Sequence, residues 1–277
     1  MSNPILVVGA GLFGQVIAAK LRLDGHMVQV FDSQEPGSGS KPSGGHLKPS
    51  WLSFLDRKER DTAFETLDAL YGMETLKCQF LTRTVDLMRI DVDKVLNTGK
   101  VFLAKVTSIG DGWLRYTPKG SIDSNVHVKG TVIVAAGVWC ARLMPHLVGT
   151  TFAKQGVSWL FTGVTTPPEN LIAPWAPYKQ VVRTNHGPGT VWMGDGSAII
   201  PENWNDNKEL QIKERILKHT NFPYETLTPQ RGMRPYIRSY HQGLQQVGAQ
   251  LWVATGGGKS GMCLAGVYAN KLSEALR

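Results

Sequence analysis

The sequence predicts an α/β fold in which a Rossmann-like nucleotide-binding domain is interleaved with a second domain built on an antiparallel sheet. Residues 5–32 follow the order strand, glycine-rich turn, helix, strand. Residues 130–137 and 251–255 are apolar runs with small residues at their ends, typical of strands buried in a parallel sheet. Residues 156–200 instead contain short alternating runs separated by Pro and Gly, which indicates antiparallel strands. A chain of 277 residues is long enough for both domains.

The first element is a βαβ unit, ILVVGAGLFGQVIAAKLRLDGHMVQVFD, at residues 5–32. Gly9 permits a tight turn, Gly11 lets backbone N–H groups approach a pyrophosphate, and Gly14 lets the helix pack closely on the strand. The helix N-terminus favours phosphate charge. Asp32 closes the second strand, where a carboxylate can accept both hydroxyls of an adenosine ribose. No basic residue directly follows it, which argues against NADP and leaves NAD and FAD open.

The next segments alternate between loop, helix and strand. Residues 33–45 form a loop rich in Gly, Ser and Pro, whose paired glycines can let the backbone run against a flat cofactor ring. Residues 51–71 have helical spacing of apolar side chains, residues 80–90 alternate as a strand does, and residues 91–96 predict a short helical turn.

A hairpin is predicted for strands 101–109 and 113–117, which flank Gly110-Asp111-Gly112. Strand 251–255, loop 256–261 and the helix after it have the same order as the first βαβ unit. The N-terminus of this second helix is therefore also expected to point at an anionic or electron-rich group. The other predicted elements are strands at 126–129, 130–137, 157–163, 180–184, 190–194 and 251–255, and helices at 207–219 and 262–276.

The net charge of +8 is unusual for an enzyme of small metabolites. Basic charge raises the local concentration of polyanions, so nucleic acid is a candidate partner. The alternative is that the charge serves solubility alone. The oligomeric state stays open.

Three cysteines, Cys78, Cys140 and Cys263, are scattered, so we expect buried free thiols. The seven histidines show no metal-ligand spacing, and no metal is predicted. No apolar run approaches the ~20 residues of a membrane span. The first strand follows Pro4 directly and leaves no room for a cleavable leader, so we expect a cytoplasmic protein without a membrane partner.

Five segments in the same order resemble the FAD-dependent amine oxidases of the D-amino-acid oxidase, glycine oxidase and sarcosine oxidase group. They are VVGAGLFG with Asp32, Ser43-Gly44-Gly45, TVIVAAGVW at residues 131–139, Arg231-Gly232-Met233-Arg234-Pro235, and residues 254–264. The resemblance implies a glutathione-reductase-type FAD domain. No cysteine stands where sarcosine oxidases attach flavin, so FAD is expected to bind non-covalently, and the host cytoplasm is the expected location if the gene belongs to a phage.

The resemblance also implies roles for individual residues. Arg234 matches the arginine that anchors the substrate carboxylate, and Lys259 matches a second cation from the C-terminal loop. His46 follows the glycine loop and either reaches the flavin ring or is a structural histidine. The residues expected to hold FAD are Gly9, Gly11, Leu12, Phe13, Gly14, Asp32, Ser33, Ser43, Gly44, Gly45, His46, Val106, Ala135, Ala136, Gly137, Trp139, Gly256, Gly257, Gly258, Lys259, Ser260, Gly261 and Met262.

Both expected domains are discontinuous. The FAD domain takes residues 1–50, 100–150 and 235–277, and the substrate domain takes residues 51–99 and 151–234. The chain is shorter than typical members of the group, mainly between residues 51 and 101, which implies a more open substrate side.

The function expected from the resemblance and the charge is oxidation of the Cα–N bond of a glycine-like amine carried on a modified nucleic-acid base. It releases glyoxylate and leaves an aminomethyl base, as the phage FAD-dependent lyases of thymidine hypermodification do. One alternative is an oxidase of a free small amino acid or N-methylamine that produces hydrogen peroxide. Another is a flavin-bound nucleic-acid-binding protein without turnover, using a basic and aromatic strip of Arg234, Tyr236, Arg238, Tyr240 and His241.

Overall fold

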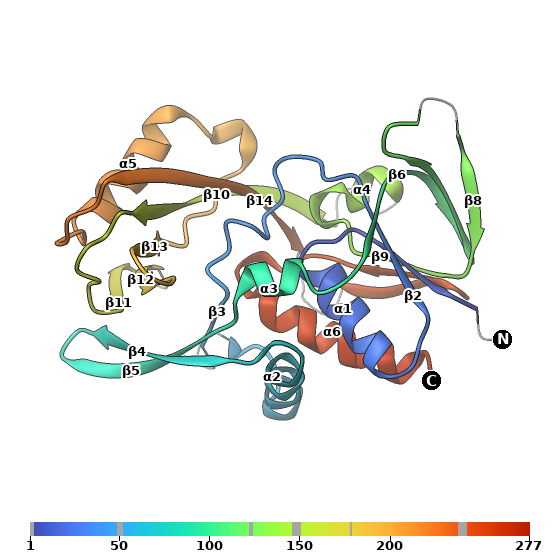
Figure 1. The fold of residues 1–277 in the computed structure, drawn as a ribbon, viewed down its shortest axis with the longest axis horizontal. Helices are drawn as coiled ribbons and strands as arrows, with labels where there is room; N and C mark the ends of the chain where they lie inside the picture. The colour runs from blue at the N-terminus through green and yellow to red at the C-terminus, as the bar shows by residue number, and fades with distance from the viewer. Residues whose placement is uncertain (1–2, 49–51, 122–123, 146–150, 178, 238–242) are drawn as a thin grey trace.

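Two eight-stranded sheets organise the computed structural model of the chain, which describes residues 3–48, 52–121, 124–145, 151–177, 179–237 and 243–277 (Figure 1). The strand orders are β15-β16-β9-β1-β2-β6-β7-β8 and β14-β10-β13-β12-β11-β4-β5-β3. The α/β fold class predicted from the sequence is confirmed. The exact domain boundaries stay a prediction.

The first sheet has a parallel centre and antiparallel edges. Its parallel strands are β1 (Ile5–Val8), β2 (Val28–Asp32), β6 (Val101–Gly110), β9 (Thr131–Val134) and β16 (Leu251–Ala254). Its antiparallel edge strands are β7 (Trp113–Pro118), β8 (Val126–Lys129) and β15 (Leu244–Gly248). This arrangement confirms the predicted βαβ unit and the hairpin of β6 and β7.

Both faces of the parallel strands are covered, which explains their continuous apolar runs. On β1, Ile5 and Val7 pack in one core with α1 (Leu12–Leu23) and α6 (Gly261–Ala275). Leu6 and Val8 pack in a second core with β6 to β8 on the other face. Figure 1 shows α1 and α6 side by side below the sheet, with α2 (Arg57–Tyr71) next to them.

The second sheet is antiparallel except where β11 and β4 pair in parallel, among the described residues. Its strands are β3 (His46–Leu47), β4 (Glu74–Phe80), β5 (Arg83–Arg89), β10 (Thr151–Thr162), β11 (Leu171–Ala176), β12 (Lys179–Asn185), β13 (Thr190–Gly194) and β14 (Thr226–Ile237). Helix α5 (Asp206–Leu217) covers one face through Ile212 and Ile216, which pack with Trp159 of β10. The opposite face of β10 and β14 is therefore the one available to a ligand.

The strand predicted at residues 80–90 is wrong at its start, because it is the second half of a hairpin formed by β4 and β5. The hairpin turns at Leu81, which has φ +54° without being glycine, so the usual turn signal is missing. Strands β3, β11 and β15 were also not predicted. The remaining short elements are α3 (Val92–Leu96), η2 (Gly137–Trp139), α4 (Cys140–Leu143), η4 (Pro201–Asn203) and η6 (Gly258–Ser260).

The described residues answer three simpler questions. All three cysteines are buried free thiols, as predicted. None of the helices in these residues is both long and apolar enough to cross a membrane. Nor do these residues contain a cluster of three or more metal-ligating side chains.

Candidate active site

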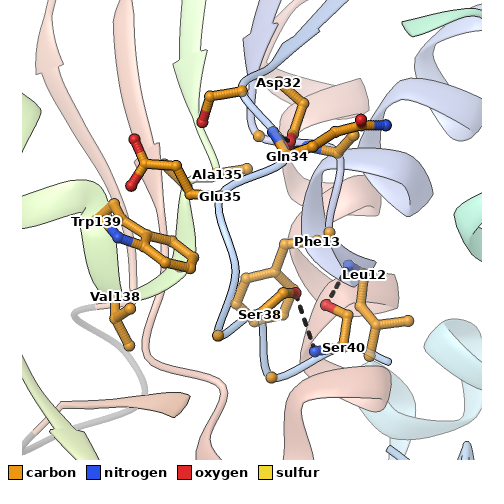
Figure 2. Close-up of a pocket in the computed structure, with 18 of the residues that line it drawn as sticks. Leu12, Phe13, Asp32, Gln34, Glu35, Ser38, Ser40, Ala135, Val138 and Trp139 are labelled. Atoms are coloured by element: carbon orange, nitrogen blue, oxygen red, sulfur yellow. Dashed lines mark hydrogen bonds between the residues drawn. The ribbon is translucent and has the colours of Figure 1, made fainter. Parts of the chain in front are cut away.

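A cavity of about 1000 Å³ lies between the carboxyl ends of β1, β2 and β9 and the second sheet near β14 (Figure 2). It is at the upper end of the size of small-molecule sites in proteins, which suits a long ligand. The position follows the rule that open α/β sheets bind ligands beyond the carboxyl ends of their strands.

The turn after β1 shows why its glycines are needed. Gly9 has φ +105°, and a Cβ atom on it would stand 2.5 Å from the backbone oxygen of Ala135. A Cβ atom on Gly14 would stand 1.7 Å from the backbone oxygen of Gly9. The turn therefore touches both its own helix and the end of β9, and neither position has room for a side chain.

Asp32 lies at the end of β2 and lines the cavity. Its Oδ2 accepts a hydrogen bond of 2.6 Å from Ala10 N, and its Oδ1 accepts one of 2.5 Å from Gln34 N. Ser40 holds the following loop against the start of α1, because its Oγ accepts a 3.0 Å hydrogen bond from Leu12 N (Figure 2). The carboxylate is thus held at the position where the motif places the ribose of a dinucleotide.

Most of the predicted FAD residues meet around this cavity. Those that line it are Gly9, Gly11, Leu12, Phe13, Asp32, Ser33, Val106, Ala135, Ala136, Gly137, Trp139, Gly257, Gly258 and Gly261. They come from five separate places in the chain: the β1 turn, the end of β2, β6, the end of β9 with η2, and the η6 loop. Thr255 joins the last two, since its Oγ1 donates a 3.2 Å hydrogen bond to Gly137 O.

Eight predicted FAD residues do not line the cavity among the described residues. They are Gly14, Ser43, Gly44, Gly45, His46, Gly256, Ser260 and Met262. A Cβ atom on Gly45 (φ +68°) would stand 2.0 Å from Ile90 O, and one on Gly44 would stand 2.3 Å from the His46 ring. These two glycines are needed for packing beside β3 and β5, and their contact with a flavin ring stays a prediction.

The His46 ring lies against the second sheet. Its Nε2 is 2.9 Å from Thr184 Oγ1, and its centroid is 4.9 Å from Trp192 and 6.1 Å from His186. Burial, together with the positive charges of His186 and Arg89, lowers the pKa of His46 to about 3. His46 is therefore neutral at neutral pH, and these contacts suit the structural alternative.

Arg234 lies on β14, lines the cavity, and faces Lys154 on β10. Its guanidinium lies across Gly156, where a Cβ atom would stand 3.2 Å from Arg234 Cζ and 3.0 Å from Ser197 O. No carboxylate of the described residues forms an ion pair with Arg234. None of these carboxylates therefore neutralises its charge. Lys259 belongs to η6, but its side chain is outside the described part, so its role stays a prediction.

The sequence prediction missed several cavity residues of the loop after β2, of α4 and of β14. They include Gln34, Glu35, Ser38, Gly39, Ser40, Pro42, Arg142 and Met233. Arg142 Nη1 and Glu35 Oε2 are 3.3 Å apart and join α4 to the loop. The only local signal was the Gly/Ser-rich composition of residues 33–45, which predicts a loop and not its contacts. In the predicted basic strip, Arg238, Tyr240 and His241 lie outside the described residues.

The cavity suits a long anionic ligand with a flat, close-fitting part. Among the described residues, five basic ones line it, Lys41, Lys105, Arg142, Arg231 and Arg234, against two acidic ones, Asp32 and Glu35. The Arg231 side chain pairs with Glu209 on α5. The glycines at positions 9 and 14 let the turn pack against the end of β9 and the start of α1 at the edge of the cavity, and Asp32 suits a ribose. The residues present therefore fit FAD, and fold and site together define a dinucleotide-dependent oxidoreductase.

A family model described as FAD dependent oxidoreductase (DAO) matches residues 94–275. The chain belongs to this family, and FAD is its cofactor. No curated protein matches the sequence.

Solved structures share the fold. Glycine oxidase from Bacillus cereus ATCC 14579 is similar with a TM-score of 0.71 and 13% identity, over 99% of this chain and 95% of that one. Iminodiacetate oxidase from Chelativorans sp. BNC1 is similar with a TM-score of 0.68 and 14% identity, over 97% and 94%. L-proline dehydrogenase from P. horikoshii is similar with a TM-score of 0.65 and 13% identity, over 99% and 92%.

Proposed function

We propose that this oxidoreductase oxidises the Cα–N bond of a glycine-like amine whose carboxylate binds Arg234. The supporting observation is the Arg234 guanidinium, which borders the cavity and has no ion-pair partner among the described residues. A guanidinium binds a carboxylate through two parallel hydrogen bonds, so it fixes the orientation of the substrate as well as its position. Glycine oxidase and iminodiacetate oxidase, among the proteins of similar fold, are named for substrates of this class.

The residues of the chain supply binding and orientation in this proposal. FAD, when bound, accepts the hydride from the substrate carbon, and oxygen restores it with formation of hydrogen peroxide. Once the carbon has lost this hydride and the nitrogen has lost a proton to water, the substrate is an imine. Water then hydrolyses the imine to glyoxylate and a free amine. Arg234 keeps the reacting carbon in a fixed position, so the reaction does not depend on a random encounter in the right orientation. Backbone N–H groups at the start of α6, beside Gly258 and Gly261, favour negative charge at that end of the cavity.

We further propose that the glycine is carried on a modified nucleic-acid base, so that the products are glyoxylate and an aminomethyl base. The net charge of +8 and the basic excess around the cavity support it. An exposed basic face on β6, β7 and β8 supports it as well: Lys105, Arg115, His127 and Lys129 point outward there, and Arg115 lies 5.6 Å from the ring of Trp113. Basic and aromatic side chains together bind single strands through phosphate contacts and base stacking.

A free small amino acid or N-methylamine is the second candidate substrate. It is supported by the names of the structural neighbours, whose substrates are small. The two candidates differ in their dependence on salt, because binding of a polyanion releases counterions and weakens steeply as salt rises.

Flavin absorbance distinguishes these candidates. The FAD-loaded protein is mixed without oxygen with glycine, sarcosine, iminodiacetate, or an oligonucleotide that carries glycine on a base methylene. Bleaching by the oligonucleotide, with release of glyoxylate and loss of rate at high salt, is the expected result. Bleaching by the free amines alone contradicts the nucleic-acid substrate. No bleaching by any of them, with oligonucleotide binding unchanged in Arg234→Ala, favours a flavin-bound protein without turnover.

A further inference from the structure

A second cation stands directly opposite Arg234. In the antiparallel pair of β10 and β14, Lys154 is the register partner of Arg234. Like charges directly across a strand pair repel each other and destabilise the sheet. Within the described part of the chain neither cation has an ion-pair partner, although other surface cations such as Arg231 do. A pair of this kind is most easily explained by an anionic ligand that binds between or beside the two charges.

Aromatic rings fix the position of Lys154 without neutralising it. Its Nζ atom is 4.9 Å from the ring centroid of Tyr236 and 5.4 Å from that of Phe152. The two rings stack, with centroids 5.7 Å apart and planes 21° apart. A ring face attracts a cation through its quadrupole but carries no net charge. The ammonium group is thus held in place with its charge still available.

This cluster adjoins the end of the cavity where Arg234 lies. Tyr236 forms an isolated bridge with Gly257, and a Cβ atom on Gly258 would stand 2.9 Å from the Tyr236 ring. Gly257 and Gly258 both line the cavity. Burial raises the pKa of the Tyr236 hydroxyl, and the nearby Arg234 cation opposes part of that rise. Lys154 is therefore one aromatic ring away from the cavity wall, on the same face of the sheet as Arg234.

We propose that Lys154 is a second anion-binding residue of the substrate site. Arg234 binds the carboxylate next to the reacting carbon, and Lys154 binds a further acidic group of the same molecule. This inference rests on the proposed function and narrows its substrate class to glycine-like amines with two acidic groups. The second group is a carboxylate in a dicarboxylic amine or a phosphate in a nucleotide. Phe152 is 43% exposed beside the cation, and a flat apolar surface next to a charge favours the nucleotide.

Lys154→Met tests the proposal, because it keeps the length of the side chain and removes only the charge. Two substrate pairs differ by one acidic group each: iminodiacetate with sarcosine, and the deoxyuridine carrying glycine on its base methylene, with and without a 5′-phosphate. We expect the wild-type protein to favour the more acidic member by about tenfold or more in kcat/KM, since one charged hydrogen bond contributes about 1.5–3 kcal/mol. Lys154→Met should reduce that ratio to about one by raising KM for the more acidic member. The kcat/KM of the less acidic member should stay unchanged. The pair whose ratio collapses identifies the second group as carboxylate or phosphate.

Lys213→Met is the matched control. Its Nζ atom lies 5.5 Å from the ring of Trp159, so it makes the same kind of contact, but on the face of β10 that α5 covers. It should keep the wild-type ratio, and Lys154→Arg should restore most of it. A ratio that Lys154→Met leaves unchanged overturns the proposal, as does an equal loss for both members of each pair.

A binding measurement separates this proposal from the proposed function. Malonate and acetate, which cannot be oxidised in this way, are titrated into the FAD-loaded protein, and the shift of flavin absorbance gives their dissociation constants. We expect malonate to bind about tenfold more tightly than acetate in the wild type and equally in Lys154→Met. Should none of the amines reduce the flavin while malonate keeps this preference, the proposed oxidation fails and the role of Lys154 stands. Equal affinities in the wild type refute the role of Lys154.

Discussion

The turn after β1 and the strand pair of β10 and β14 both face the cavity, but different kinds of contact determine their structures. The turn is determined by backbone contacts, since Gly14 and Gly9 are too close to each other for any side chain. The strand pair is determined by a register that runs over all of β10 and β14, so side chains on its face, such as Lys154 and Arg234, can differ without changing the backbone. The first region therefore tolerates almost no substitution, whereas the second can change its ligand through single side chains.

The two regions differ because one binds the cofactor and the other is proposed to bind the substrate. Family members need the same cofactor geometry, and backbone contacts preserve it without regard to the rest of the sequence. The substrate differs between proteins of similar fold, and exchangeable side chains on a sheet face suit that need. Variants in the two regions should accordingly fail in different ways.

The largest effect should come from Gly14→Val in the turn. The new side chain would begin 1.7 Å from Gly9 O, a backbone atom that cannot move without displacing β1 or α1. We expect complete loss of bound FAD, measured as the ratio of flavin to protein absorbance after purification.

Gly25→Ala is the matched control for that variant. Gly25 has a positive φ, of +90°, and nothing lies within 4 Å of its Cβ position, whereas Gly14 lies in α1 and is restricted by the close contact alone. The cost should be only the strain of the left-handed conformation, about 1–2 kcal/mol, with FAD content unchanged. Equal flavin loss in both variants would show that the close contact at Gly14 is not what holds the turn.

The second effect should come from Arg234→Met in the strand pair. Loss of the carboxylate partner costs about 3–4 kcal/mol, because the substrate anion keeps its desolvation cost without compensation. We therefore expect kcat/KM for a glycine-like amine to fall about 100-fold to 1000-fold, with normal FAD content. Stopped-flow reduction of the flavin measures the rate.

Arg115→Met is the control, because Arg115 is exposed on the outer face of β7, away from Arg234. Its rate with a small amine should equal that of the wild type. If Arg234→Met loses FAD and keeps its substrate affinity, Arg234 binds the cofactor and not the substrate.

The same difference explains which features could be predicted from the sequence. The βαβ unit was predictable because most of its constraints, such as those of Gly14 against Gly9 and of Asp32 against Ala10, join residues within about thirty positions. The contact of Gly9 with Ala135 is the exception. The turn at Leu81 was not, because a positive φ without glycine leaves no signal in composition. Arg234 was identified through a local Gly-x-Arg-Pro segment. Its neighbour Lys154 was missed, because the register that brings residues 154 and 234 together is set by the whole sheet.

The third effect concerns stability and pH, and it belongs to the sheet that carries Arg234. Burial lowers the pKa of His46 to about 3 and that of His186 to about 4. Both are neutral in the folded protein, whereas in the unfolded chain they take up protons below a pH of about 6.5. The unfolded state binds more protons in this range. The free energy of unfolding therefore contains the full contribution of the two histidines above about pH 6.5, and it falls as the pH decreases toward 4. Each histidine contributes a slope of about 1.4 kcal/mol per pH unit.

His46→Gln should reduce the slope of the unfolding free energy against pH by the contribution of one histidine, about 1.4 kcal/mol per pH unit. Urea unfolding followed between pH 4.5 and 7.5 measures the free energy at each pH. His127→Gln, at an exposed position on β8 that leaves His46 and His186 in place, is the control. A slope unchanged in His46→Gln would show that His46 already accepts a proton in the folded protein, and would revive its role beside the cofactor.

The smallest effect, and the sharpest test of the comparison, should come from Gly156→Ala. Here glycine makes room for a side chain as well as for backbone: the new methyl group would stand 3.2 Å from Arg234 Cζ and 3.0 Å from the backbone oxygen of Ser197. The guanidinium can move by a few tenths of an ångström, so we expect KM for the amine to rise about threefold to tenfold, a loss of about 1 kcal/mol, with FAD content and kcat nearly unchanged. In the Arg234→Met background the same substitution should add nothing, because the two residues act as one unit. Additive losses in the double variant would mean that Gly156 serves the backbone after all, and that the distinction between the two walls of the cavity is wrong at this position.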